Sequence, residues 1–238
     1  PSLPLYVLKN NPKYKAVAYL DADLFFYDSI DSVLKEFGNN SIYTVEHRYP
    51  QGQEHRNETT GRFNVAFQIF RNDDTGNKCL RLWRKQCIDW CYWKKEDGKM
   101  GDQMYLNEWP NIYKKVCISG NIGVDTAPWN ISQYRVTTNQ KKVKINNTPL
   151  VCYHFHQLDI ISVDKFEFAS GYNLNKNTIN LIYRPYTQKL SDLISSLQKK
   201  YSTFRINRRE IPFLIWIKNK LARHIGPIYW AFIGIWKK

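Results

Sequence analysis

The sequence predicts a layered α/β fold, in which helices cover a β-sheet. Apolar runs of strand length alternate with segments of helical periodicity, and Gly38, Gly98 and Pro110 stand at three of the junctions. Hydrophobic residues make up 43% of the 238 residues and aromatic residues 15%, which excludes a disordered chain. A chain of this length forms one large domain, or one domain with an extension.

The first predicted elements are a strand, a helix and a second strand. Residues 16–20 form an apolar run that predicts a buried strand, and residues 30–37 predict a helix that ends at Gly38. Residues 41–45 predict the second strand. Residues 48–61 contain one Pro, two Gly and no apolar periodicity, so we expect a long exposed loop of the kind that often covers a site.

A helix with a tryptophan-rich face follows the third strand. Residues 62–70 alternate in hydrophobicity and predict that strand, with Asn64 out of step. Residues 78–95 predict the helix, because apolar residues recur there at helical spacing. These residues are Leu80, Trp83, Cys87, Trp90 and Cys91. We interpret the tryptophans as core residues.

Three shorter elements complete this part of the chain. Residues 102–109 predict a short helix that stops at Pro110, because proline interrupts helices. Residues 115–118 and 149–154 predict two further strands.

The cysteines favour a reduced, cytosolic protein over a disulfide framework. Their number is odd, they form no CxxC pair and most lie in apolar segments. They are Cys79, Cys87, Cys91, Cys117 and Cys152. Cys87 and Cys91 share a predicted helix face, but two thiols alone are an incomplete metal site.

The positive charge gathers at the end of the chain. The net charge is +14, and residues 188–238 contain eleven Lys and Arg against two acidic residues, hence +9. The predicted helices there have basic and aromatic faces, which are typical of peripheral contact with an anionic membrane surface. The apolar stretch 225–236 has 12 residues, fewer than the roughly 20 that span a bilayer. The alternatives are packing onto the domain and binding of nucleic acid, which no RNA-binding or helix-turn-helix motif supports.

Two acidic residues stand at the end of the first predicted strand. Asp21 and Asp23 follow the run 16–20 at alternate positions, so in an extended chain both side chains leave on the same side. The two carboxylates can share one divalent cation, and without one they would repel and desolvate each other. The alternative is a polar strand exit, with Asp28 and Ser29 capping the next helix.

Two histidines end the last predicted strand. His154 and His156 are two residues apart, so both side chains project to one side of a strand. A neutral imidazole nitrogen is a suitable further ligand for a cation that two carboxylates already hold. A structural histidine at a strand end is the alternative. The hypothesis is a metal site made of Asp21, Asp23, His154 and His156.

Four motifs follow one another along the chain. They are DxD at Asp21 and Asp23, FNVAF at 63–67, GDQMYLN at 101–107 and VCYHFH at 151–156. In this order the chain resembles the GT-A glycosyltransferases, which use nucleotide-diphospho-sugars, and most closely the retaining family 8 type that includes glycogenin and bacterial galactosyltransferases. The resemblance covers residues 16–157. It implies a Rossmann-like α/β domain with a mixed, mostly parallel sheet flanked by helices.

The resemblance also implies a cofactor and its ligands. Asp21 and Asp23, with Ala22 between them, would bind Mn²⁺ or Mg²⁺, which bridges the diphosphate of the sugar donor. His154 would complete the metal site, and His156 is the second choice.

Roles for three further residues follow from the same resemblance. Asn64 would touch the donor sugar or the acceptor, and Asp102 would hold hydroxyl groups of the donor sugar. Gln103 would lie near the anomeric carbon, where an amide can stabilise an oxocarbenium-like centre, in keeping with retention.

The chain departs from the family pattern at three points. Ala66 stands where related enzymes have a glycine, and Ala127–Asn130 (APWN) precedes the histidine that a Lys-Pro-Trp follows in the family. Only twenty residues precede Asp21, whereas GT-A folds place two or three βα units of roughly 30 residues there. We therefore expect an N-terminally truncated fragment without the pocket for the nucleotide base, and activity of the parent enzyme rather than of the fragment.

The expected function is that of a metal-dependent glycosyltransferase of the hexosyltransferase type. Residues 1–187 would form the partial catalytic domain and residues 188–238 a basic amphipathic extension. The enzyme would act in the cytoplasm, at the periphery of the membrane, and extend a glycan or a lipid-linked acceptor in cell-surface polysaccharide synthesis. The alternatives are a metal-dependent nucleotidyltransferase and a non-catalytic basic protein that binds membranes or nucleic acid.

Overall fold

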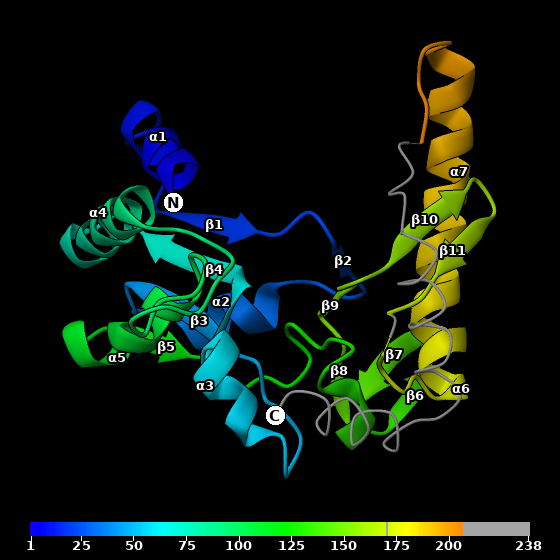
Figure 1. Cartoon of the computed structure of the whole chain (residues 1–238), viewed down its shortest axis with the longest axis horizontal. Coiled ribbons are helices and arrows are strands. Elements are labelled where there is room, and N and C mark those ends of the chain that lie inside the picture. Colours follow the sequence, from blue (N-terminus) through cyan, green and yellow to red (C-terminus); the bar gives the residue numbers. More distant parts are fainter. Residues whose placement is uncertain (170, 207–238) are drawn as a thin grey trace. The chain divides into compact units, whose positions relative to one another are not determined.

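A computed structural model describes residues 1–169 and 171–206 (Figure 1). By its internal contacts the chain divides into two compact units, Pro1–His154 and Phe155–Lys238. The basic aromatic helices expected beyond residue 206 lie outside the described residues. The boundary expected between residues 187 and 188 stays a prediction.

A mixed four-stranded sheet is the centre of the first unit. Its order is β1 (Ala16–Leu20), β4 (Phe63–Arg71), β3 (Ile42–Glu46) and β5 (Val116–Ile118). Strand β4 runs antiparallel to both of its neighbours, and only β3 and β5 pair in parallel. The α/β class is therefore confirmed, whereas the expectation of a mostly parallel sheet is wrong.

The position of β4 explains the error. Helix α2 (Asp31–Phe37) connects β1 with β3, and these two strands do run in the same direction, because β4 is antiparallel to each. Alternation of strands and helices predicts the relative direction of the strands that a helix connects. It does not predict that a later strand lies between them.

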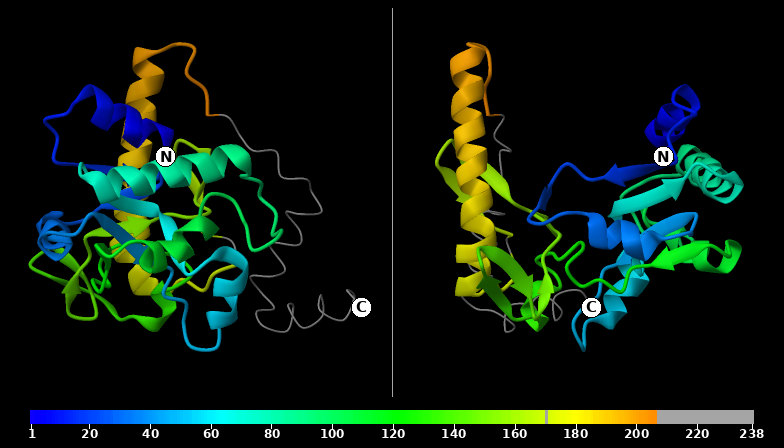
Figure 2. Two further views of the ribbon diagram at one scale, coloured as in Figure 1. Left: turned by 90° about the vertical axis from the view of Figure 1, so that its left-hand side faces the viewer. Right: turned by 180° about the vertical axis from the view of Figure 1, so that it is seen from behind.

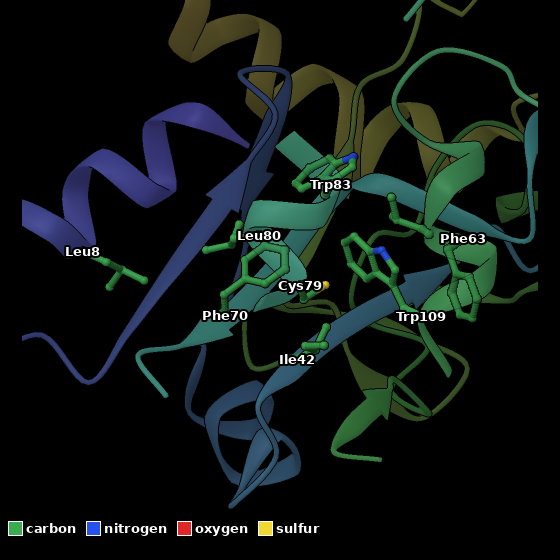
Figure 3. Packing of buried hydrophobic residues seen from close by; sticks show 9 residues of the cluster. Leu8, Ile42, Phe63, Phe70, Cys79, Leu80, Trp83 and Trp109 are labelled. Atoms are coloured by element: carbon green, nitrogen blue, oxygen red, sulfur yellow. The ribbon is translucent and has the colours of Figure 1, made fainter. Parts of the chain in front are cut away.

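Helices cover both faces of this sheet. Helices α1 (Ser2–Asn10) and α4 (Asp74–Asp89) lie side by side on one face, as Figures 1 and 2 show. Their core includes Leu8, Leu80 and Trp83 packed on the strand residues Ile42 and Phe70 (Figure 3). On the other face, α2 packs into a second core of nine buried residues. They are Val33, Phe37, Tyr43, Val45, Phe67, Ile69, Val124, Val151 and Cys152.

Helix α4 is well defined at both ends, but it is shifted from its expected bounds. The Asp73 side chain caps its start by accepting a hydrogen bond from the Gly76 amide, at 2.8 Å. The helix ends at Asp89 because Trp90 has extended backbone angles. The expected range 78–95 placed Trp90 and Cys91 on the helix, but both residues lie beyond its end. Trp83, in contrast, is fully buried.

Two segments expected from the sequence differ in detail. The exposed segment 48–61 is not a plain loop, because it contains the short helices η1 (Glu54–Arg56) and α3 (Asn57–Thr60). The helix expected at 102–109 is a 3₁₀ helix, η2 (Met104–Glu108), and Pro110 lies in the first turn of α5 (Trp109–Ile112). Proline fits a first turn because its missing N–H has no helical acceptor there.

Several small sheets complete the first unit. Strand β2 (Leu24–Phe26) pairs antiparallel with β9 (Cys152–His154), and neither belongs to the central sheet. A three-stranded sheet consists of β6 (Val136–Asn139), β7 (Lys142–Ile145) and β8 (Thr148–Pro149), with η3 (Ile131–Gln133) before it. The strand expected at 149–154 is thus divided between β8 and β9.

The second unit consists of a hairpin and a helical segment. The hairpin pairs β10 (Asp159–Ser162) with β11 (Lys165–Glu167). A short α6 (Lys176–Thr178) leads through the π-helical turn η4 (Ile179–Tyr183) into α7 (Arg184–Lys200). Within residues 1–169 and 171–206, no helix combines the length and the apolar character that crossing a bilayer requires.

Candidate metal centre

A tight turn at the end of β1 presents the two acidic residues of the DxD motif. The Asp21 amide donates to the Ala66 carbonyl of β4 at 3.0 Å, which keeps the start of the turn beside the central sheet. The Leu24 amide closes the turn on the Asp21 carbonyl at 3.3 Å. Ala22 is exposed at the tip, and both acidic residues are partly exposed. The carboxylates can therefore be reached from solvent.

The pairing of β2 with β9 brings His154 to these carboxylates. Leu24, the residue after Asp23, lies opposite His154 in the strand register. The His154 Nε2 atom lies 3.2 Å from Asp23 Oδ1. Asp21, Asp23 and His154 each offer a ligand atom, and these three atoms lie within 4.8 Å of one another. Three of the four residues named as metal ligands thus come together.

The other histidine, His156, belongs to the second unit. Its ring lies edge-on to the Tyr172 ring, with 6.3 Å between the ring centroids. His154 is the last residue of the first unit, so the cluster of three ligands lies within that unit.

A second carboxylate, that of Asp125, contacts the other ring nitrogen of His154. Asp125 Oδ1 lies 3.2 Å from His154 Nδ1, and the Asp125 side chain is completely buried. Trp129 meets the same imidazole edge to face, with 5.1 Å between the centroids. Sequence reasoning missed both residues. The available signal was a charged residue, Asp125, in the mostly apolar stretch 124–129, and nothing in the sequence paired it with a histidine.

Burial and charge act in opposite directions on the titrating groups of the cluster. Burial alone would lower the pKa of His154, but the hydrogen bonds to Asp125 and Asp23 raise it to about 10. Burial raises the pKa of Asp21, against the hydrogen bond from Tyr19 and the charge of His154. The imidazole is thus protonated between the two carboxylates at neutral pH, and a cation that binds its Nε2 displaces a proton.

Asn64 is buried, and both polar atoms of its side-chain amide contact other groups of the protein. The Asn64 Oδ1 atom accepts from the Ala66 amide at 2.8 Å, and its Nδ2 lies 3.1 Å from His47 Nε2. The register between β3 and β4 shifts at this point, so the side chain supplies a partner that the strand ladder does not. A contact of Asn64 with donor or acceptor stays a prediction.

Asp102 and Gln103 lie where the η2 segment approaches β4. Burial raises the pKa of the Asp102 carboxyl, whose charge also raises the pKa of Asp21. The Gln103 amide bridges two backbone segments, because its Nε2 donates to the Thr60 carbonyl at 2.6 Å and its Oε1 accepts from the Val65 amide at 3.0 Å. The roles of Asp102 and Gln103 toward a sugar stay predictions.

The donor set of the cluster fits a hard divalent cation. Carboxylate oxygens suit Mg²⁺ and Mn²⁺, and one imidazole nitrogen beside them favours Mn²⁺ over Mg²⁺. Three ligands from the protein leave further coordination positions for water or for oxygens of a substrate. All five cysteines are free thiols and none belongs to this cluster.

Comparisons with known proteins identify relatives. YfnD of Bacillus subtilis (strain 168), a curated protein described as uncharacterized, is 30% identical over 207 residues, which are 86% of this chain and 67% of YfnD. The chain belongs to the YfnD family. YfnF of the same organism, also described as uncharacterized, is 28% identical over 202 residues, 81% of this chain and 65% of YfnF. The chain thus spans about two thirds of the length of these relatives. No protein-family model matches it.

Two solved structures resemble part of the chain. One is a glycosyltransferase involved in the glycosylation of the major capsid of PBCV-1, with a TM-score of 0.44, 9% identity, and coverage of 66% of this chain and 67% of that one. The other is the glycosyltransferase GlyE of Streptococcus pneumoniae TIGR4, with a TM-score of 0.42, 17% identity, and coverage of 84% and 48%. Scores below 0.5 do not establish a common fold, so any assignment of function depends on the residues of the site.

Proposed function

We propose that this member of the YfnD family is a metal-dependent glycosyltransferase of the hexosyltransferase type. It would move a sugar from a nucleotide-diphospho-sugar to a glycan or a lipid-linked acceptor. The observation that carries the proposal is the cluster of Asp21, Asp23 and His154, whose ligand atoms lie within 4.8 Å of one another at the end of β1. The order of the four sequence motifs supports the same assignment.

The three residues of the cluster would provide different ligand atoms for a cation. Asp21 and Asp23 provide anionic oxygens from one turn, and His154 provides a nitrogen from β9. A bound Mn²⁺ or Mg²⁺ supplies positive charge that stabilises the nucleoside diphosphate as it leaves the anomeric carbon. The partial exposure of both acidic residues leaves the diphosphate a route to the site.

Two neighbouring residues would orient the donor sugar. Asp102 has a half-buried carboxylate that can accept hydrogen bonds from sugar hydroxyl groups. The Gln103 amide would have to exchange a backbone partner for the sugar, because both of its polar atoms are bonded. With an amide rather than a carboxylate at the anomeric carbon, we propose transfer with retention of configuration.

The decisive experiment measures product release from a panel of nucleotide sugars by the full-length protein. We expect nucleoside diphosphate to be released with Mn²⁺ or Mg²⁺ and not with a chelator. Asp23→Asn should lower kcat/KM at least about 100-fold. Asp31→Asn, which changes an exposed acidic residue of α2, is the matched control and should have no effect.

The identity of the product separates the two enzymatic assignments. Release of pyrophosphate would identify a nucleotidyltransferase instead of a glycosyltransferase. Turnover that continues unchanged in the presence of a chelator would contradict the metal site.

We also propose that the basic segment 188–238, with its net charge of +9, holds the enzyme at the cytoplasmic face of a membrane during polysaccharide synthesis. The test is co-sedimentation with anionic and with neutral lipid vesicles at several salt concentrations. Binding that is confined to anionic vesicles and weakens with salt is expected. Preference for duplex DNA over both kinds of vesicle would instead indicate a nucleic-acid adaptor.

A further inference from the structure

Asp125 contacts His154 at the ring nitrogen that does not face Asp23. The distance from Asp125 Oδ1 to His154 Nδ1 is 3.2 Å, and that from His154 Nε2 to Asp23 Oδ1 is also 3.2 Å. We propose that Asp125 is a positioning residue that holds His154 in the tautomer and the ring orientation that a divalent cation requires. This inference rests on the metal site of the proposed function.

The surroundings of Asp125 indicate a specialised carboxylate. The residue is 0% exposed, and its Oδ2 has no hydrogen-bond partner among the residues that the structure describes. An incompletely bonded carboxylate in the interior is costly, since it loses its hydration without full replacement. The contact with His154 offsets part of this cost.

The backbone around Asp125 is fixed independently of the histidine. Asp125 has a left-handed φ of 54°, which is strained for a residue with a Cβ. The Arg48 guanidinium donates to the carbonyl oxygens of Asn121 and Asp125, each at 3.2 Å, and also to that of Val124. The Asp125 amide donates to Cys152 Sγ at 3.3 Å. The carboxylate is therefore presented by a braced turn.

The same turn also fixes the backbone of His154. The His154 amide donates to the Thr126 carbonyl at 2.8 Å, one residue after Asp125. The Trp129 ring packs at a steep angle to the imidazole and limits its rotation, and the Trp129 Nε1 atom donates to the His47 carbonyl at 3.0 Å. Both the main chain and the ring of His154 thus take their position from residues 125–129.

The chemistry of imidazole makes this contact selective for one tautomer. A neutral imidazole has one N–H and one lone pair, and a carboxylate can only accept. When a cation takes the place of the proton on Nε2, the remaining N–H belongs on Nδ1, toward Asp125, and the Nε2 lone pair is left for the cation. Carboxylates that bond the outer nitrogen of a metal-ligating histidine typically account for about 10- to 100-fold in metal affinity.

The first test is a titration of the full-length protein with Mn²⁺. The electron paramagnetic resonance signal of the free ion measures how much Mn²⁺ is bound at each step. Asp125→Asn keeps the size of the side chain but offers a donor as well as an acceptor, so the wrong tautomer becomes possible. We expect its Mn²⁺ affinity to fall about 10- to 100-fold. Asp31→Asn is the control and should bind as the wild type does.

A double-mutant cycle distinguishes positioning from a general loss of structure. If Asp125 acts through His154, Asp125→Asn should cost nothing further in a His154→Ala background. Equal losses in both backgrounds would overturn the inference. Unchanged affinity of Asp125→Asn alone would also overturn it while leaving the metal site intact, whereas a wild type that binds no Mn²⁺ would overturn both.

A second measurement needs no variant and so does not depend on whether Asp125→Asn folds. Nitrogen-15 NMR of histidine-labelled wild-type protein with Mg²⁺ reports which ring nitrogen of His154 carries the proton. We expect a protonated Nδ1 and an unprotonated Nε2. The reverse assignment would contradict the proposed role of Asp125.

Discussion

The imidazole Nε2 of His154 lies 3.2 Å from a carboxylate oxygen of Asp23, although the two residues come from distant parts of the first unit. The contact depends on β2 and β9, a two-stranded sheet outside the central one. In its register Leu24 lies opposite His154, so the acidic turn and the histidine are placed by a few backbone hydrogen bonds. A slip by one residue would turn the histidine to the other face.

Binding of Mn²⁺ should stabilise the folded protein. An ion that binds only the folded state at 100 times its dissociation constant adds about 2.7 kcal/mol to the free energy of unfolding. Thermal unfolding with Mn²⁺ and with a chelator measures the effect. Asp21→Asn should lose most of it, and an equal shift in Tm for that variant would place the ion elsewhere.

Acid should destabilise the protein in part through His47. This residue is 3% exposed, and burial lowers its pKa to about 3. Between pH 3 and the value of about 6.5 of a free histidine, the unfolded chain binds a proton that the folded chain does not. The free energy of unfolding should therefore fall as the pH drops through this window, by up to about 1.4 kcal/mol per pH unit from this group.

The His47 effect can be isolated by comparing two variants. His47→Gln should show a shallower dependence of unfolding free energy on pH between 3 and 6.5, measured by urea unfolding. His55→Gln, at an exposed position, should keep the slope of the wild type. Identical slopes for all three proteins would contradict the assignment.

Gly76 should not tolerate a side chain. A Cβ there would lie 2.2 Å from the Arg71 carbonyl oxygen and 3.1 Å from that of Ser41, both of them backbone atoms that cannot easily move. We expect Gly76→Ala to lower the free energy of unfolding by about 3 kcal/mol. Gly120→Ala, whose Cβ would meet only the end of the Glu36 side chain at 3.5 Å, is the control for chemical denaturation and should be close to neutral.

Trp83 should connect the stability of α4 with the position of Asp102. Its Nε1 donates to the Asp102 carbonyl at 2.9 Å, and its ring meets Trp109 edge to face at 5.5 Å. Trp83→Phe keeps an aromatic ring but removes the donor, so we expect a loss of about 1–3 kcal/mol in urea unfolding. Trp93→Phe alters a tryptophan that is 85% exposed and should change stability by less than about 0.5 kcal/mol.

Local chemistry made several elements predictable from the sequence. The strand at 16–20 was predicted with its observed bounds, because an apolar run ends there at two charged residues. The expectation that it is buried was wrong, because β1 lies at the edge of the sheet and its residues are partly or fully exposed. The helix that ends at Phe37 was predicted because Gly38 adopts the left-handed φ of 48° that glycine favours. These features depend on neighbouring residues alone.

Long-range contacts determined what the sequence did not predict. The insertion of β4 between β1 and β3 depends on packing between segments far apart in the chain. In the sequence, the helical spacing of apolar residues continues past the end of α4. The chain nevertheless leaves the helix at Trp90, whose carbonyl accepts a hydrogen bond from the Tyr105 hydroxyl. Asp125 and His154 are 29 residues apart in the sequence, and hydrophobic periodicity does not predict contacts between such distant residues.

Every side chain assigned to holding or orienting the ion lies before the unit boundary at His154. The hairpin and helices that follow contribute none of these groups. On the proposed assignment, changes in sequence after residue 154 would therefore leave all three ligands of the cation in place.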